Sequence, residues 1–142
     1  MSKLIPDFPA NFAFFTLLPV RVTDLNYGGH VGNDRVLSLI HEARMQYLAK
    51  LQLSELRFGE TGLILKQVSI DFVKEMFWGD MLQVSVTAGE FSRVAFALFY
   101  KIEIVNGSET TVAALAKTMM ICYDYEKKKL SLLADDIKQK LI

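Results

Sequence analysis

A single long helical pattern, followed by strand-like segments with short turns, constrains this chain most. Apolar side chains recur at helical spacing between Val36 and Leu51. Beyond Leu63 the period changes to two, as in strands with one buried face. The turns between these later segments are too short for the crossover that parallel strands need. The pattern therefore predicts one α+β domain over residues 1–142, in which a mainly antiparallel sheet curls around one helix.

A loop rich in glycine and asparagine leads into the predicted helix. Asn33 occupies the expected N-cap and Asp34 the first turn, where a carboxylate meets the positive end of the helix dipole. The wide apolar arc predicts that other structure covers most of the helix. The opposite, modestly polar side faces either solvent or the wall of a site. The apolar arc comprises Val36, Ile40, Ala43, Tyr47 and Leu51, flanked by Leu37, Leu39 and Leu48.

Strand patterns occupy most of the remaining chain. The Asn106-Gly107 pair between two of them predicts a type I′ hairpin turn. Residues 94–100 are apolar at almost every position, so this segment is either central in its sheet or covered by a partner subunit. We expect strands over residues 11–18, 63–72, 82–87, 94–103 and 112–123, with residues 20–23 extending the first one and a short helix over residues 131–141.

Charge and composition limit the possible partners. Sixteen basic and sixteen acidic side chains cancel, so no overall field favours nucleic acid or an anionic membrane. The apolar run over residues 12–20 is too short to span a bilayer and makes a poor secretory signal. The single cysteine, Cys122, fits a reducing compartment and is expected to be a core side chain rather than a nucleophile. We therefore expect a soluble cytoplasmic protein.

The strands carry more apolar side chains than one helix can cover. An exposed apolar face of this kind is usually buried against a second copy of the same chain. The sequence therefore predicts a homodimer.

The run V-R-V-T-D-L-N-Y-G-G-H-V-G-N at residues 20–33, followed by L-I-H-E-A-R, resembles a known signature. It is similar to that of the hot-dog fold thioesterases related to 4-hydroxybenzoyl-CoA thioesterase. Gly79-Asp80 and Ser92-Arg93 also match that family pattern, and the resemblance extends over residues 12–133. It implies a hot-dog fold, with a long central helix wrapped by a curved antiparallel sheet of about five strands.

The resemblance also implies an activity, which is hydrolysis of an acyl-CoA or acyl-carrier-protein thioester. The site would lie at the seam between two subunits of a homodimer or homotetramer, and no cofactor is required. Backbone amides at the start of the helix are suited to hold the negative charge that develops on the thioester carbonyl oxygen. The residues expected to bind substrate are Tyr27, Gly28, Gly29, Val31 and Asn33, with His30 among the amide donors.

One departure from the family pattern affects the chemistry. Asn26 stands where the family has the acid that acts as nucleophile or general base, and an amide cannot take a proton from water. The leading hypothesis is that Asn26 and His30 position water and carbonyl, while Asp24 or Glu42 supplies basicity. Each has an ordinary structural alternative: a cap for Asp24, a loop hydrogen bond for His30, a surface pair with Arg44 for Glu42.

Other functions and sites are less well supported. Loss of the acid at Asn26 favours, as the alternative function, a non-catalytic module that binds an acyl-thioester or lipid. A hydratase usually carries a longer histidine motif with prolines, which is absent here. Asp71 faces solvent or reaches across the dimer seam. His30 and His41 are eleven residues apart without further ligands at suitable spacing, so no metal site is expected.

Overall fold

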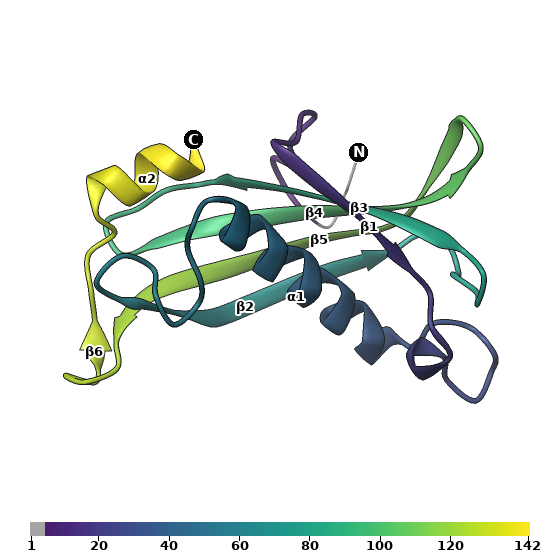
Figure 1. Cartoon of the computed structure of the whole chain (residues 1–142), viewed down its shortest axis with the longest axis horizontal. Helices are drawn as coiled ribbons and strands as arrows, with labels where there is room; N and C mark the ends of the chain where they lie inside the picture. The colour runs from purple at the N-terminus through teal and green to yellow at the C-terminus, as the bar shows by residue number, and fades with distance from the viewer. Residues whose placement is uncertain (1–4) are drawn as a thin grey trace.

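The computed structural model describes residues 5–142 and contains one antiparallel sheet with a long helix lying across it (Figure 1). The strand order is β1-β3-β4-β5-β2, and a short β6 pairs with β5. The predicted α+β class and antiparallel sheet are confirmed. The elements are β1 (Phe14–Pro19), η1 (Val22–Asp24), α1 (Asn33–Lys50), β2 (Gly62–Phe72), β3 (Met81–Gly89), β4 (Ala95–Asn106), β5 (Glu109–Asp124), β6 (Lys129–Leu130) and α2 (Asp135–Leu141).

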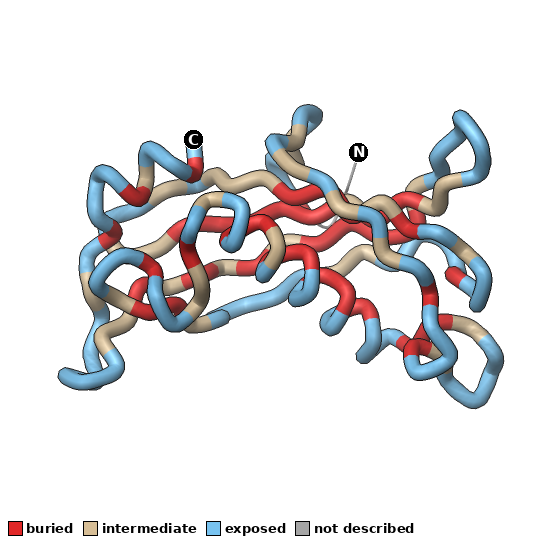
Figure 2. The backbone as a smooth tube through the Cα atoms, viewed as in Figure 1, coloured by how far each residue is buried: buried red, intermediate tan, exposed pale blue. Residues whose placement is uncertain are grey.

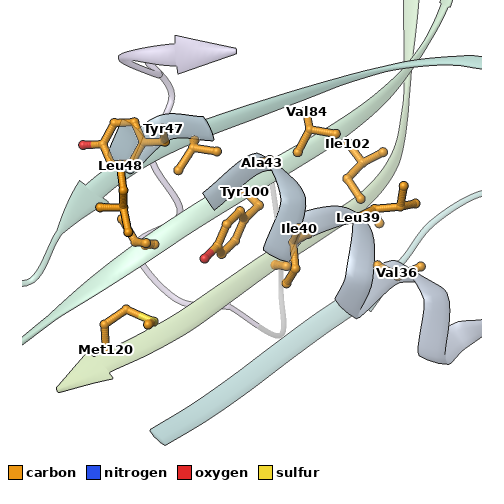
Figure 3. Packing of buried hydrophobic residues seen from close by; sticks show 14 of the residues in the cluster. Val36, Leu39, Ile40, Ala43, Tyr47, Leu48, Val84, Tyr100, Ile102 and Met120 are labelled. Atoms are coloured by element: carbon orange, nitrogen blue, oxygen red, sulfur yellow. The ribbon is translucent and has the colours of Figure 1, made fainter. Parts of the chain in front are cut away.

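The main core lies between α1 and the central strands. The apolar arc of the helix packs against side chains that alternate along β3, β4 and β5 (Figure 3). Burying each such side chain contributes about 1.5–3 kcal/mol, so this contact holds the helix on the sheet. The helix side of the contact comprises Val36, Leu39, Ile40, Ala43, Tyr47 and Leu48, and the labelled strand side chains are Val84, Tyr100, Ile102 and Met120.

A buried arginine adds a polar network beneath α1, which the sequence did not predict. Arg44 is only 5% exposed, so its interpretation as a surface residue is wrong. Its Nη1 donates to the Tyr100 hydroxyl at 3.2 Å and its Nε donates to Glu55 Oε1 at 3.2 Å. The Tyr100 hydroxyl also bonds Thr118 Oγ1 at 2.8 Å. Burial raises the pKa of Tyr100, and the positive charge of Arg44 partly offsets that rise.

The chain's own N-terminal segment covers the outer face of the sheet, which is the face opposite α1. Phe8 and Phe12 pack with buried Ile5 on a second cluster that includes Ala97 and Phe99. Residues 94–100 are thus apolar on both sides because β4 is central and because this segment covers its outer face. No partner subunit is needed to explain that pattern.

Several local predictions were wrong at their boundaries. Residues 20–23 do not extend the first strand, because Pro19 ends it and a 3-10 turn, η1, follows. β1 is an edge strand with alternating exposure rather than a buried strand. The N-cap of α1 is Gly32, and Asn33 is the first helical residue. The hairpin loop is Gly107-Ser108 with positive φ only at Gly107, as in a type II′ turn, because Asn106 pairs with Glu109.

The strand β2 lies at the opposite edge of the sheet from β1 and is poorly covered (Figure 2). Its apolar side chains were expected to form one buried face. In the single chain Val68 is 39% exposed and Phe72 is 51% exposed. An edge strand has a neighbour on one side only, and here β5 is that neighbour. A long apolar edge strand of this kind can pair with a strand of a second chain.

The buried arginine gives a stability prediction. Arg44→Ala removes the packed aliphatic stem and takes one hydrogen-bond donor from each of Tyr100 and Glu55, so the free energy of unfolding should fall by about 3 kcal/mol. Urea denaturation measures this change. Arg35→Ala on the exposed side of the same helix should change stability by less than about 0.5 kcal/mol. Equal stability of the two variants would contradict the role given to the network.

Candidate functional site

The loop before α1 closes on itself through backbone hydrogen bonds. The Asn26 amide donates to the His30 carbonyl at 2.9 Å, and the Gly29 amide donates to the Asn26 carbonyl at 3.1 Å. Gly29 has a φ of +85°, a backbone conformation that residues with a Cβ rarely adopt. The Gly32 amide donates to the Asp24 carbonyl at 3.1 Å. The loop is therefore a defined turn, and it fixes the direction in which α1 begins.

Asn26 and His30 converge over Gly28. The Asn26 Oδ1 accepts a hydrogen bond from the Gly28 amide at 2.9 Å. An ideal Cβ built on Gly28 would lie 3.2 Å from Asn26 Oδ1 and 3.5 Å from His30 Nε2. The two side chains that the sequence singled out thus flank one small region of the loop, and Asn26 shapes its backbone.

One hydrogen bond of the His30 ring favours a particular tautomer. Its Nδ1 lies 3.2 Å from the Val31 carbonyl oxygen, which can only accept, so the proton of the neutral ring is on Nδ1. Nε2 is then an acceptor. The ring is half-buried and meets Phe77 edge-on, with the two centroids 6.4 Å apart. In this form His30 can accept a proton or orient a water, but it cannot donate from Nε2.

Most of the backbone amides expected to hold an oxyanion already have acceptors. The amides of Gly28 and Gly29 both donate to Asn26, and the Val31 amide donates to the Met76 carbonyl at 2.8 Å. The expectation that these three are free donors is therefore wrong, since the turn itself uses them. Among residues 5–142, no acceptor faces the His30 amide. Tyr27 is fully exposed at the tip of the loop.

A pocket of about 160 Å³ lies between this loop, the start of α1 and the segment that follows β2. The sequence predicted the loop side of the pocket but missed the other wall, because the bridge between His30 and Phe77 joins segments far apart in the chain. The lining residues are His30, Val31, Asn33 and Val36 on one side and Phe72, Val73, Lys74, Glu75 and Met76 on the other.

Asp24 lies outside this pocket. It is 2% exposed, and its Oδ2 accepts a hydrogen bond from the Arg21 amide at 2.8 Å. The Arg21 guanidinium Nε lies 3.6 Å from the same oxygen. The carboxylate therefore serves as the cap of η1, which was its structural alternative.

Glu42 lines a different pocket, of about 140 Å³, on the side of α1 that faces β1. Its Oε2 accepts a hydrogen bond from Gln46 Nε2 at 2.8 Å, and Gln46 Oε1 accepts one from the Thr16 hydroxyl. Arg21 and Leu18 contribute to the same pocket. Since β1 and β2 are opposite edges of the sheet, the structure does not bring Glu42 together with His30.

Asp71, the remaining sequence candidate, does not line this pocket. Asp71 is half-buried and pairs in register with Leu115 of the outer cluster, so it lies on the outer face. No group of three or more potential metal ligands occurs within residues 5–142. No helix in that range is long and apolar enough to cross a bilayer.

Cys122 gives a prediction for the core. Its side chain is fully buried, and burial raises the pKa of the thiol to about 11. Because the thiolate is the reactive form, labelling by a disulfide reagent near pH 8 should be at least about 100-fold slower in native than in denatured protein. The rate should increase as the pH is raised toward that pKa. Stoichiometric labelling of the native protein within the mixing time of the experiment would contradict the burial of Cys122.

Comparisons with known proteins agree with this geometry. A family model described as Thioesterase-like superfamily matches residues 20–141. A 1,4-dihydroxy-2-naphthoyl-CoA hydrolase of Microcystis aeruginosa is 28% identical over 125 residues, which are 86% of this chain and 88% of the relative. The corresponding hydrolase of Nostoc punctiforme is 27% identical over 128 residues, or 86% of this chain and 82% of the relative.

Solved structures extend the likeness to three dimensions. A 1,4-dihydroxy-2-naphthoyl-CoA thioesterase from Synechocystis superposes with a TM-score of 0.80 at 26% identity, covering 90% of this chain and 94% of that one. A 4-hydroxybenzoyl CoA thioesterase mutant complexed with 4-hydroxybenzoyl CoA superposes with a TM-score of 0.82, covering 91% of this chain and 98% of that one. At 15% identity the second match is evidence for the fold alone.

Proposed function

Because the chain belongs to the thioesterase-like superfamily, we propose that it hydrolyses acyl-CoA thioesters in the pocket beside His30. The resemblance to 4-hydroxybenzoyl-CoA-type thioesterases and the hot-dog fold, both predicted from the sequence, are confirmed by the family match and the solved structures. The observation that carries the proposed site is the pocket itself. It brings an imidazole with a free acceptor nitrogen to the start of α1.

The proposed reaction adds water to the thioester carbonyl carbon and breaks the C–S bond. His30 Nε2 orients the water by accepting one of its hydrogen bonds. The backbone amide of His30 and the side-chain amide of Asn33 are the donors available to the developing oxyanion. A donor that is placed in advance stabilises the transition state more than the ground state.

We assign the other loop residues to positioning. Asn26 keeps Gly28 and Gly29 in the turn that presents His30, and Val31 links the loop to the segment after β2. Tyr27, exposed at the loop tip, is available to a bound CoA rather than to the acyl group. Asp24 supports the loop through η1, and Glu42 acts at most from its separate pocket.

The relatives suggest which substrates to test first. The two relatives from Microcystis and Nostoc are named as hydrolases of 1,4-dihydroxy-2-naphthoyl-CoA, and the pocket wall here is largely apolar, with Val36, Phe72, Val73 and Met76. Aromatic acyl-CoAs are therefore the first members of a panel that also includes aliphatic acyl-CoAs and acyl-carrier protein.

This proposal predicts that purified protein hydrolyses at least one acyl-CoA of the panel. His30→Ala should lower kcat/KM by about 100-fold, which is the usual contribution of a positioned acid or base group. The measurement is release of free CoA thiol. His41→Ala is the matched control, because His41 lies exposed on α1 and bonds Glu55. Absence of hydrolysis for every substrate, or an undiminished His30→Ala variant, would refute the assignment.

The second candidate is a non-catalytic module that binds an acyl-thioester or lipid, and the amide at Asn26 favours it. Asn26→Asp keeps an acceptor for the Gly28 amide while adding a carboxylate. The binding-module alternative expects no turnover from the natural protein and a large gain of hydrolysis in this variant. Turnover by the natural protein rejects it.

We also propose that the functional unit is a homodimer or homotetramer assembled through β2. Support comes from the exposed Leu65, Val68 and Phe72 on an eleven-residue edge strand, with Leu37 of α1 40% exposed. Phe72, the last residue of β2, lines the pocket beside His30, so a second chain paired along β2 would border this pocket. A reducing cytoplasmic location suits Cys122, which is a free thiol.

The assembly can be tested by light scattering on a sizing column. The natural protein should show a mass that is a multiple of the 16.1 kDa chain, whereas Val68→Lys should shift it toward the single chain. Val22→Lys, which changes an exposed valine of η1, serves as the control. A natural protein that elutes as one chain would reject assembly through β2.

A further inference from the structure

The pocket beside His30 lacks the acid that the family pattern places at Asn26, and the other sequence candidates do not supply one. Asp24 is buried in the cap of η1, and Glu42 lines the other pocket, which lies on the side of α1 that faces β1. Asp80 accepts the Phe77 amide at 2.8 Å in its own turn. Within this chain, the carboxylate best placed to act on a thioester is therefore one that lines the pocket itself.

Glu75 is the acidic residue among those that line this pocket. It is exposed, and within residues 5–142 its carboxylate has no hydrogen-bond or ion-pair partner. Every other acid considered above already binds an amide or a side chain. A carboxylate without a structural partner is free to accept a proton from water without disturbing the fold.

The backbone on both sides of Glu75 is fixed. The amides of Val73 and Lys74 donate to the Ala113 carbonyl at 2.9 and 3.0 Å. On the other side, buried Met76 accepts the Val31 amide at 2.8 Å. Glu75 is thus held at a set position opposite the loop that carries His30, although the two residues are 45 positions apart in the sequence. Positioning of this kind favours reaction between groups from distant segments.

We propose that Glu75 is the general base of the thioesterase, in place of the acid missing at Asn26. Glu75 takes a proton from the water that His30 Nε2 orients, while the water oxygen bonds to the thioester carbonyl carbon. The C–S bond then breaks, the CoA sulfur takes the proton from Glu75, and the acyl group leaves as a carboxylic acid. One water is consumed per thioester, and no other reactant is required. This inference rests on the proposed acyl-CoA hydrolysis.

The test uses the full chain and the acyl-CoA that the natural protein hydrolyses best. Glu75→Gln should lower kcat by at least about 100-fold and change KM by less than about threefold, because the carboxylate acts on water rather than on substrate binding. Glu109→Gln, the same change on an exposed glutamate of β5, should leave kcat unchanged. Thermal unfolding should be the same for both variants.

A second variant separates a catalytic from a structural role. In Glu75→Ala, added formate should raise kcat at least about tenfold over the value without formate, because a small carboxylate can occupy the position that the glutamate side chain has left. A structural loss would not respond to formate. The double variant Glu75→Gln, Asn26→Asp should also regain activity if a carboxylate beside His30 is what the site lacks.

The outcomes distinguish this inference from the proposed function. An active natural protein whose Glu75→Gln variant keeps more than about a third of its kcat would overturn the role of Glu75 and leave thioester hydrolysis standing. A loss of kcat that formate does not restore would also overturn it. A natural protein that is inactive on the whole panel would overturn both.

Discussion

The hydrogen bond from the Val31 amide to the Met76 carbonyl, 2.8 Å long, joins the two halves of the site. Val31 comes just before the long helix and Met76 just after the edge strand β2, so the bond connects segments that the sheet would otherwise leave apart. It closes one side of the pocket and brings His30 opposite Glu75. This bond itself depends on the apolar contact that holds α1 on the sheet, because the loop that carries Val31 leads directly into α1.

The sequence predicted the elements well wherever periodicity is strong. The long helix and the antiparallel strands follow from patterns of apolar side chains, and the structure selects the central position of residues 94–100 from the two alternatives that their pattern left open. Predictions were weaker where backbone hydrogen bonds decide the conformation. Pro19 and the Asp24 cap convert an expected strand extension into η1, and the pairing of Asn106 with Glu109 moves the hairpin turn by one residue.

The candidate site was predicted in part. The glycine loop, Asn26 and His30 do lie together, because they are close in the sequence and fold as one turn. The opposite wall could not be predicted, because it depends on a bridge between His30 and Phe77 that leaves no periodic signal. Glu42 was placed correctly on the polar side of α1, yet only the structure reveals that this side faces β1 rather than the pocket. Arg44 was misplaced because its buried partner Tyr100, which also bonds Thr118, comes from a strand far away in the sequence.

The location of the acyl group tests the central claim most directly. A crystal structure of the protein with a non-hydrolysable acyl-CoA analogue would define it, since the pocket beside His30 and the pocket beside Glu42 lie on opposite sides of α1. We expect the carbonyl carbon of the analogue between His30 and Glu75, with the acyl group against Val36 and Met76. An analogue bound beside Glu42 instead, with the His30 pocket empty, would contradict the assignment of the site.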